Sequence, residues 1–287
     1  MEILLVASIL ARWGEVIPTP LETPPFEYEL KEAVESIPTL VLSKSAPNGV
    51  TDYESWFVGK YDWPSITYHN GGVNDAIRAR GEAPEGIDGI LHTPGEGVFR
   101  LYQVIFCDEA VLAVYGSPPN RFGVVLDPRI LVVLGPDDNR MLHVLDFLSY
   151  AEGPVSQRLD EEAVFQEIRW AWVEDGILYV SNAHRTFAES SCGMNGYITA
   201  IDLSNFDLLW RSRPLVSNSE NFVVTGDAII TGYGFTGESD FVYVLDRRTG
   251  GIVQQVEVPS APEYFYLDGD RLEVRCCDTD LVFDLSR

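Results

Sequence analysis

The amino-acid sequence predicts an all-β fold built from repeated four-stranded antiparallel sheets. Short runs rich in Val, Ile, Tyr and Phe alternate with turns rich in Gly, Asp, Asn and Ser, which is the pattern of strands joined by hairpins. The pattern recurs at a spacing of roughly 40 to 50 residues, as expected for a repeat fold. No long amphipathic helix competes with it, and a chain of 287 residues can bury a substantial core, so we expect one domain over residues 1–287.

The clearest internal repeat relates residues 122–146 to residues 222–246 without a gap. Both copies begin with Phe and end with the triplet Val-Leu-Asp. A shorter match places residues 222–227 over residues 265–270, and a further copy lies between Trp172 and Asp202. In the clearest copy we expect four strands, a to d, at residues 221–224, 228–233, 241–245 and 252–258.

Four antiparallel strands in each copy describe the blade of a β-propeller. A period of about 41 residues over this length predicts seven blades, with six as the alternative. Upstream, we expect strands b, c and d of one blade at residues 89–92, 98–106 and 110–115, and parts of another blade at residues 39–43, 55–61 and 65–68. The last copy stops after strand c at residues 281–285, so we expect the N-terminal strand Glu2–Ile9 to supply its outer strand and close the ring.

One segment carries a more specific pattern. Residues 200–210 resemble the tryptophan-docking motif A-x-D-x-x-T-G-x-x-x-W of the quinoprotein (PQQ-like) superfamily, a WD40-like β-propeller repeat family. Ala200, Asp202 and Trp210 match, whereas Asn and Phe replace the Thr-Gly pair. The next copy has Thr249-Gly250 but Gln254 in place of the Trp. The resemblance implies that the Asp ends strand c, that Thr-Gly makes the turn, and that the Trp docks between neighbouring blades. It implies a fold and no activity.

Cysteines and charge limit the classes of function. The adjacent pair Cys276-Cys277 resembles the disulfide that covers the quinone in some dehydrogenases of this superfamily, but we expect no cofactor, because the accompanying calcium site has no counterpart here. The four cysteines lack metal-ligand spacing, so we also expect no metal. With 20 basic and 44 acidic residues the formal charge is −24, which disfavours nucleic acid and anionic membranes. The N-terminal apolar run lacks the charge polarity of a signal peptide, so a cytoplasmic protein is expected.

Catalytic candidates are few. His184 opens a long loop at residues 182–195 that also contains Glu189, Ser190, Ser191 and Cys192. No Gly-x-Ser-x-Gly turn accompanies this set, so we expect no catalytic residue here. A hydrolase or lyase with its active site at the mouth of the propeller channel, using His184 and nearby acids, is the alternative hypothesis. The acid pairs at residues 137–138, 268–270 and 278–280 are expected to stabilise turns rather than to bind calcium.

The long loops are the expected binding elements, because loops between strands b and c gather on one face of a propeller. They are residues 182–195, 233–240 and 135–140. The sequence predicts a non-enzymatic protein-binding propeller, monomeric on its own, that engages a basic protein partner as a scaffold or as an immunity-type neutralising partner. The predicted partner-binding residues are His184, Arg185, Phe187, Glu189, Met194, Tyr233, Phe235, Glu238, Asp240, Asp137 and Asp138.

Overall fold

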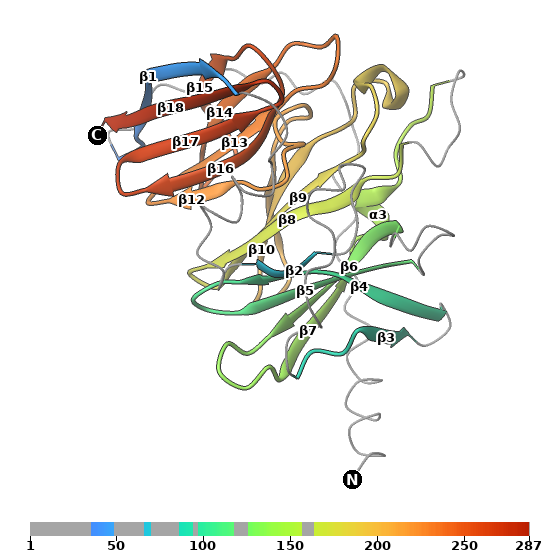
Figure 1. Cartoon of the computed structure of the whole chain (residues 1–287). Coiled ribbons are helices and arrows are strands. Elements are labelled where there is room, and N and C mark those ends of the chain that lie inside the picture. Colours follow the sequence, from blue (N-terminus) through green and yellow to red (C-terminus); the bar gives the residue numbers. More distant parts are fainter. Residues whose placement is uncertain are drawn as a thin grey trace.

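The computed structural model describes residues 36–48, 66–69, 86–93, 97–117, 126–156 and 164–286. Its strands form four antiparallel sheets, which we number I to IV in chain order apart from β1, the first strand, which belongs to sheet IV (Figure 1). Sheet II contains β8 (Glu167–Glu174), β9 (Ile177–Ala183), β10 (Tyr197–Asp202) and β11 (Leu208–Arg211). Sheet III contains β12 (Val223–Thr225), β13 (Ala228–Tyr233), β14 (Phe241–Asp246) and β15 (Ile252–Glu257).

Sheets I and IV are less regular. Sheet IV has the order β1-β18-β17-β16, with β1 (Thr39–Pro47), β16 (Pro262–Asp268), β17 (Arg271–Cys276) and β18 (Thr279–Ser286). Sheet I has the order β2-β4-β5-β6-β7, and β3 also pairs with β4. Its strands are β2 (Ile66–His69), β3 (Ile90–Thr93), β4 (Gly97–Phe106), β5 (Val111–Ser117), β6 (Leu126–Leu134) and β7 (Met141–Asp146).

The predicted repeat unit is confirmed by sheet III. Its four strands have the order β12-β13-β14-β15, and each lies within about two residues of strand a, b, c or d as expected from the pattern. Sheet II has the same sequential order. Over the described residues the fold is therefore all-β, with three four-stranded antiparallel sheets and one of six strands. The helices described there, α3 (Leu148–Ala151) and the 3₁₀ helix η3 (Ala188–Ser191), have one turn each. None of the helices in the described ranges has the length and apolar character that a membrane crossing needs.

The expected grouping of strands in the first half was wrong. The segments predicted as strands b, c and d of one blade are β3, β4 and β5, but β5 pairs with β6, so the 122–146 repeat belongs to the same sheet. Strand β2, predicted as part of another blade, also joins this sheet through β4. Residues 55–61 lie outside the described residues. Strand propensity predicted those strands that the structure describes here, but it does not specify which neighbour a strand pairs with.

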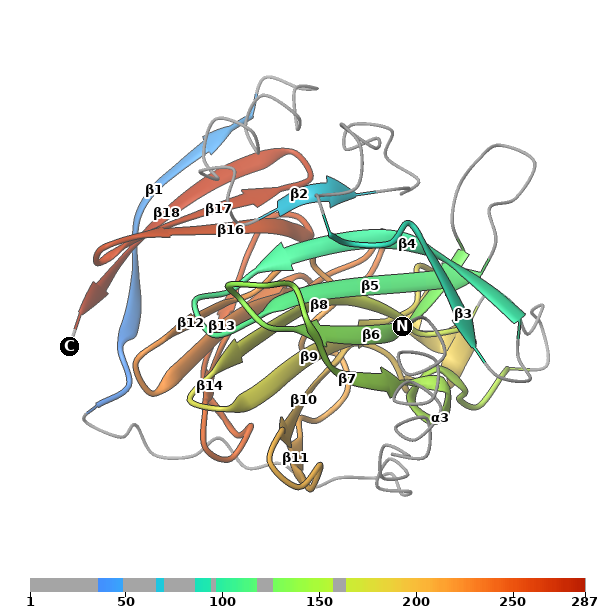
Figure 2. The same ribbon diagram turned by 90° about the horizontal axis from the view of Figure 1, so that it is seen from below.

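An N-terminal strand does complete the last sheet, but it is not Glu2–Ile9. Strand β1 pairs antiparallel with β18 over its whole length, from Thr39 with Ser286 to Pro47 with Thr279, and Figure 2 shows it along the edge of sheet IV. The outer position is thus filled by residues predicted for another blade. Residues 2–9 lie outside the described residues, and the number of blades stays a prediction.

Neighbouring sheets are joined by buried side chains. One apolar cluster extends across sheets I, II and III, and a second joins sheet III to sheet IV. At the junction of sheets II and III, Trp210 of β11 is 8% exposed, and its Nε1 donates a hydrogen bond of 3.0 Å to the Arg247 carbonyl. Its ring covers Gly250, where an added Cβ would come within 2.4 Å of the indole. The docking role implied by the motif is therefore confirmed.

The junction of sheets III and IV is made by a different contact, at Gln254, the position where the motif would have a Trp. Gln254 of β15 donates from Nε2 to the Leu40 carbonyl at 2.9 Å and accepts the Leu40 N–H at 2.7 Å. Its amide thereby pairs with β1 as a neighbouring strand would. Because β1 is the edge strand of sheet IV among the described strands, this contact both joins sheet III to sheet IV and covers part of that edge.

Candidate protein-binding site

Two of the three predicted loops come together. They are the loops predicted at residues 182–195 and 233–240. In the structure they are the connections 184–196, between β9 and β10, and 234–240, between β13 and β14, and together we call them the loop face. The rings of Phe187 and Phe235 meet edge to face, with centroids 5.0 Å apart. The Glu238 carboxylate accepts the Ala188 N–H at 2.7 Å and the Tyr233 hydroxyl at 2.8 Å. Both oxygens of Glu238 are thus engaged in holding the loops together.

Glycine and a left-handed residue shape the first loop. Helix η3 ends at Cys192, whose φ is 55°, and Gly193 follows with φ 81°. Gly196 then takes φ 68°, and a Cβ there would lie 2.9 Å from the Tyr233 ring and 3.0 Å from the Ser217 carbonyl. Only a residue without a side chain permits both this backbone conformation and this contact. The loop is therefore held against sheet III in a defined shape.

An open hollow of about 790 Å³ lies beside the joined loops. Its walls are mainly apolar and aromatic, and three of the predicted residues, Met194, Tyr233 and Glu238, line it. Phe187 is 48% exposed, which is unusual for a Phe in the described part of this chain. The lining residues are Ala188, Cys192, Gly193, Met194, Arg213, Pro214, Leu215, Tyr233, Glu238, Ser239, Phe241, Tyr243 and Gln255.

His184 is an internal structural residue. It is 2% exposed, its Nδ1 accepts the Thr186 N–H at 3.3 Å, and its Nε2 lies 2.7 Å from the Ser191 hydroxyl. Because Nδ1 is an acceptor, the neutral ring carries its proton on Nε2 and donates it to Ser191, which in turn donates to the Ala188 carbonyl. Burial lowers the pKa of His184 to about 4. The imidazole is thus not placed to take a proton from Ser191, as a serine hydrolase would require.

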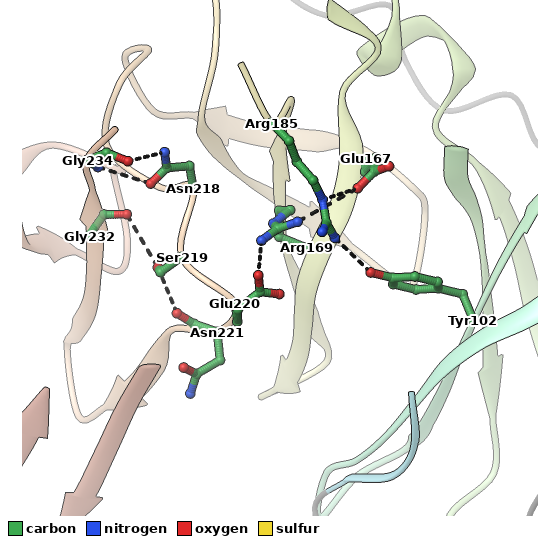
Figure 3. A network of polar contacts seen from close by, with 10 residues as sticks. All are labelled: Tyr102, Glu167, Arg169, Arg185, Asn218, Ser219, Glu220, Asn221, Gly232 and Gly234. Atoms are coloured by element: carbon green, nitrogen blue, oxygen red, sulfur yellow. Dashed lines mark hydrogen bonds and ion pairs between the residues drawn. The ribbon is translucent and has the colours of Figure 1, made fainter. Parts of the chain in front are cut away.

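Arg185, predicted as an anchor for a partner, is committed to a buried network (Figure 3). Its Nε donates to Glu167 at 2.9 Å and its Nη2 donates to the Tyr102 hydroxyl at 3.0 Å. These charges raise the pKa of Arg185 despite its burial. Arg169 bonds Glu220 in the same network. Arg185 therefore joins β8 of sheet II to β4 of sheet I and has little freedom to contact a partner.

The network continues into the segment that crosses from sheet II to sheet III (Figure 3). The Asn218 amide donates to the Gly234 carbonyl at 2.8 Å and accepts the Gly234 N–H at 3.1 Å. Asn221 makes the same two-way contact with the backbone of Phe265 in β16, at 2.8 Å in both directions. These side chains hold the crossing segment against sheets III and IV. They thereby fix the position of the backbone next to the loop face.

The structure does not bring Asp137 and Asp138 to the loop face. Their turn joins β6 to β7, and the pairing of Val111 with Leu134 places it beside the β4–β5 turn. Glu109 of that turn accepts the backbone N–H groups of residues 175 and 176, in the β8–β9 turn. That turn lies at the opposite end of β8 and β9 from His184, since Glu174 pairs with Ile177 and Glu167 with Ala183.

Asp137 and Asp138 were predicted at the wrong end because the two aligned turns follow strands at different positions in their sheets. Strands β13 and β14 are second and third in their sheet, whereas β6 and β7 are third and fourth in the run β4-β5-β6-β7. In an antiparallel run, successive turns lie at alternate ends of the sheet. The ungapped match between residues 122–146 and 222–246 is present in the sequence. However, it aligns the β6–β7 turn with the β13–β14 loop, and these two connections lie at opposite ends of their sheets.

Acidic residues border the loop face. Glu189 is exposed, and Asp240 lies near Asp278 and Glu238. Burial, with the charges of Asp278 and Glu238, raises the pKa of Asp240 to about 6. Burial makes the largest contribution to this rise, and the two neighbouring carboxylates add a smaller one that a cation brought close would offset. No group of metal-ligating side chains is present among the described residues.

Several lining residues were missed by the sequence analysis. Arg213, Pro214 and Leu215 belong to the segment after β11, while Phe241 and Tyr243 point into the hollow from β14. In the sequence, the two aromatic residues are indistinguishable from ordinary strand residues. The segment after β11 is a connection whose path cannot be deduced from periodicity. The hollow arises where elements of two sheets meet, which no local pattern marks.

Comparison with known proteins gave structural neighbours only. No family model and no curated protein matches the chain. Among solved structures, BamB from Moraxella catarrhalis matches with 14% identity and a TM-score of 0.34, over 68% of this chain and 66% of that one. Sqt1 from Saccharomyces cerevisiae matches with 14% identity and a TM-score of 0.39, over 62% and 42%. A europium-containing methanol dehydrogenase matches with 14% identity and a TM-score of 0.35, over 80% and 29%.

These matches cover less than two thirds of each neighbour's length. The repeat and its docking motif predict a PQQ-like β-propeller. The assignment of this fold depends on the sequential four-stranded sheets and on the docked Trp210. A shared fold carries no activity with it, so function has to be argued from the site itself.

Proposed function

We propose that this chain is a protein-binding β-propeller that engages a basic protein through its loop face. The observation that carries the proposal is the exposed Phe187, supported by Phe235, beside a hollow lined by Met194, Tyr233 and Phe241. Aromatic and Met side chains are enriched at protein interfaces, and an aromatic anchor next to a pocket is the usual centre of such a contact.

Charge supports a basic partner. The formal charge of the chain is −24, and Glu189, Asp240 and Asp278 contribute to it at or near the loop face. A field of this sign steers a positively charged partner toward the protein and accelerates association at low salt. Within this proposal the chain acts as a scaffold or as a neutralising partner of a basic effector, in the manner of an immunity protein.

The test compares loop-face variants with a matched variant at the opposite end of the molecule. Phe187→Ala removes the exposed ring and Glu189→Lys reverses a charge, and both residues are exposed, so the fold should be retained. Asp137→Lys makes the same change in net charge in the exposed β6–β7 turn. Immobilised protein is used to capture basic proteins from extract of the source cells at low salt, with quantification by mass spectrometry.

We expect the wild type and Asp137→Lys to enrich the same basic protein. Phe187→Ala should weaken its binding by roughly tenfold or more, as removal of an interface anchor does. Glu189→Lys should weaken it and reduce its dependence on salt. Capture that is equal for all four proteins would contradict the proposed face, and loss in Asp137→Lys alone would move the site to the other end.

A further inference from the structure

One charged side chain in the hollow lacks the ion pair that the composition would lead one to expect. Arg213 lines the hollow, and none of the ion pairs among the described residues includes it. Acidic residues outnumber basic ones by 44 to 20 in this chain. Most arginines with a described setting pair with a carboxylate, as Arg185 and Arg247 do.

The guanidinium of Arg213 is held in place by Gln255 and by Tyr243, whose side chain it hydrogen-bonds, but these contacts include no carboxylate. Its Nη2 donates a long hydrogen bond of 3.3 Å to Gln255, and its Cζ lies 5.6 Å from the centre of the Tyr243 ring. Its Nε is buried and has no hydrogen-bond partner among the described residues. A buried donor without a partner is costly, and a guanidinium offers its donors in a planar fork that matches a carboxylate.

The other charged group of the hollow is already satisfied. Glu238 accepts from the Ala188 N–H and from the Tyr233 hydroxyl, so its charge is used inside the protein. The remaining walls are mostly apolar or aromatic, including Met194, Leu215 and Phe241, and their other polar residues, Ser239 and Gln255, are uncharged. The charged group in the hollow that is free to pair with a ligand is therefore the Arg213 guanidinium, a cation, although the protein as a whole is strongly acidic.

From this we infer that the hollow takes an acidic side chain, Asp or Glu, flanked by apolar residues, on a segment of the protein partner. The inference rests on the proposed function and specifies what the partner presents. A volume of about 790 Å³ admits several side chains rather than a lone ion, and the apolar walls suit the neighbours of the carboxylate. The partner would thus be basic where it faces the acids outside the hollow, and would place one carboxylate against Arg213.

The experiment uses short blocked peptides as probes. Protein with ¹⁵N-labelled arginine is titrated with Ac-Leu-Glu-Leu-NH₂, Ac-Leu-Gln-Leu-NH₂, Ac-Leu-Lys-Leu-NH₂ and Ac-Leu-Leu-Leu-OH, and the Nε–H signals are followed by NMR. Arg213→Gln assigns the signal and removes the site. Arg140→Gln is the control, because Arg140 is an exposed arginine in the β6–β7 turn at the opposite end.

We expect the Glu peptide to shift the Arg213 signal and to bind about tenfold more tightly than the Gln peptide, since a charge-assisted pair is roughly twice as strong as a neutral one. Arg213→Gln should abolish that difference, and Arg140→Gln should keep it. Equal binding of the Glu and Gln peptides, tighter binding of the Lys peptide, or a preference for the free C-terminal carboxylate would each overturn the inference.

The two proposals fail separately. If the Glu peptide does not bind while capture still depends on Phe187, the loop face binds protein but the inference about Arg213 is wrong. If the peptide binds through Arg213 while capture is indifferent to Phe187 and Glu189, the hollow accepts carboxylates and the proposed protein-binding face is wrong.

Discussion

The contact between Trp210 and Gly250 can be tested by a double-mutant cycle. Gly250 has φ +67°, and a Cβ there would lie 2.4 Å from Cε3 of the indole. Gly250→Ala therefore combines backbone strain with a steric overlap, and only the overlap depends on Trp210. Trp210→Ala removes the ring and leaves the backbone of residue 250 as it is. Gly226→Ala is the matched control, because Gly226 has φ +54° in the same sheet and a Cβ added there would meet no atom within 4 Å.

The magnitudes follow from these contacts. Trp210 is 8% exposed, so Trp210→Ala should lower the free energy of unfolding by about 3–5 kcal/mol, including its hydrogen bond to Arg247. The left-handed backbone should cost Gly226→Ala about 1–2 kcal/mol. Gly250→Ala should cost this amount plus about 1–3 kcal/mol for the overlap. Without the indole, Gly250→Ala should cost only the backbone part, so the double mutant should be more stable than additivity predicts by about 1–3 kcal/mol.

Equilibrium urea unfolding followed by far-ultraviolet circular dichroism measures all six proteins, including Gly226→Ala combined with Trp210→Ala, without relying on tryptophan fluorescence. Gly226→Ala should cost the same with and without Trp210, which checks that the cycle reports the local contact. Additive effects of Trp210→Ala and Gly250→Ala, within about 0.5 kcal/mol, would refute the docking geometry. So would equal costs for Gly226→Ala and Gly250→Ala in the presence of the ring.

Two further predictions concern His184 and Gln254. Burial lowers the pKa of His184 from 6.5 to about 4, so between these pH values the unfolded chain binds more protons than the folded one. The contribution of His184 to the free energy of unfolding should therefore be complete above pH 6.5 and fall as the pH drops toward 4. His184→Gln should remove this part of the pH dependence in urea unfolding, and an unchanged profile would contradict the prediction. Gln254→Ala should lower the free energy of unfolding by about 1–2 kcal/mol and speed hydrogen exchange at the Leu40 amide. The control Gln255→Ala, at the exposed neighbouring residue, should leave that amide protected.

The sequence predicted sheet III well because its signals are local. Strands β13 and β14 have apolar residues bounded by turns, and Asp246 ends β14 with its Oδ1 accepting the Arg248 N–H at 2.9 Å. Pairing between distant segments is not local. Strand β1 and residues 2–9 are both apolar runs, and the choice between them depends on β18 and on the side chain of Gln254, far away in sequence.

The candidate site was predictable only in part, for the same reason. Residues in the two long loops were identified correctly as neighbours where loop length and composition sufficed, as for Phe187 and Phe235. The role of Arg185 depends on Tyr102 in another sheet, and its burial could not be deduced from its place in a loop. Asp138 shows the opposite failure: its turn was recognised, but the end of the sheet on which it lies depends on strand count.

The net charge of the protein and the chemistry of the hollow act over different distances. At physiological salt, exposed charges are screened beyond about 8 Å, so the acids around the loop face govern how a basic partner approaches. Inside the hollow, salt screens charges only weakly, because groups there are in contact and the walls are mostly apolar. A single guanidinium therefore determines which charged group binds. A global charge of −24 therefore does not determine the sign of the group that enters. Salt should change chiefly the rate of association, whereas Arg213 should affect chiefly how long the complex lasts.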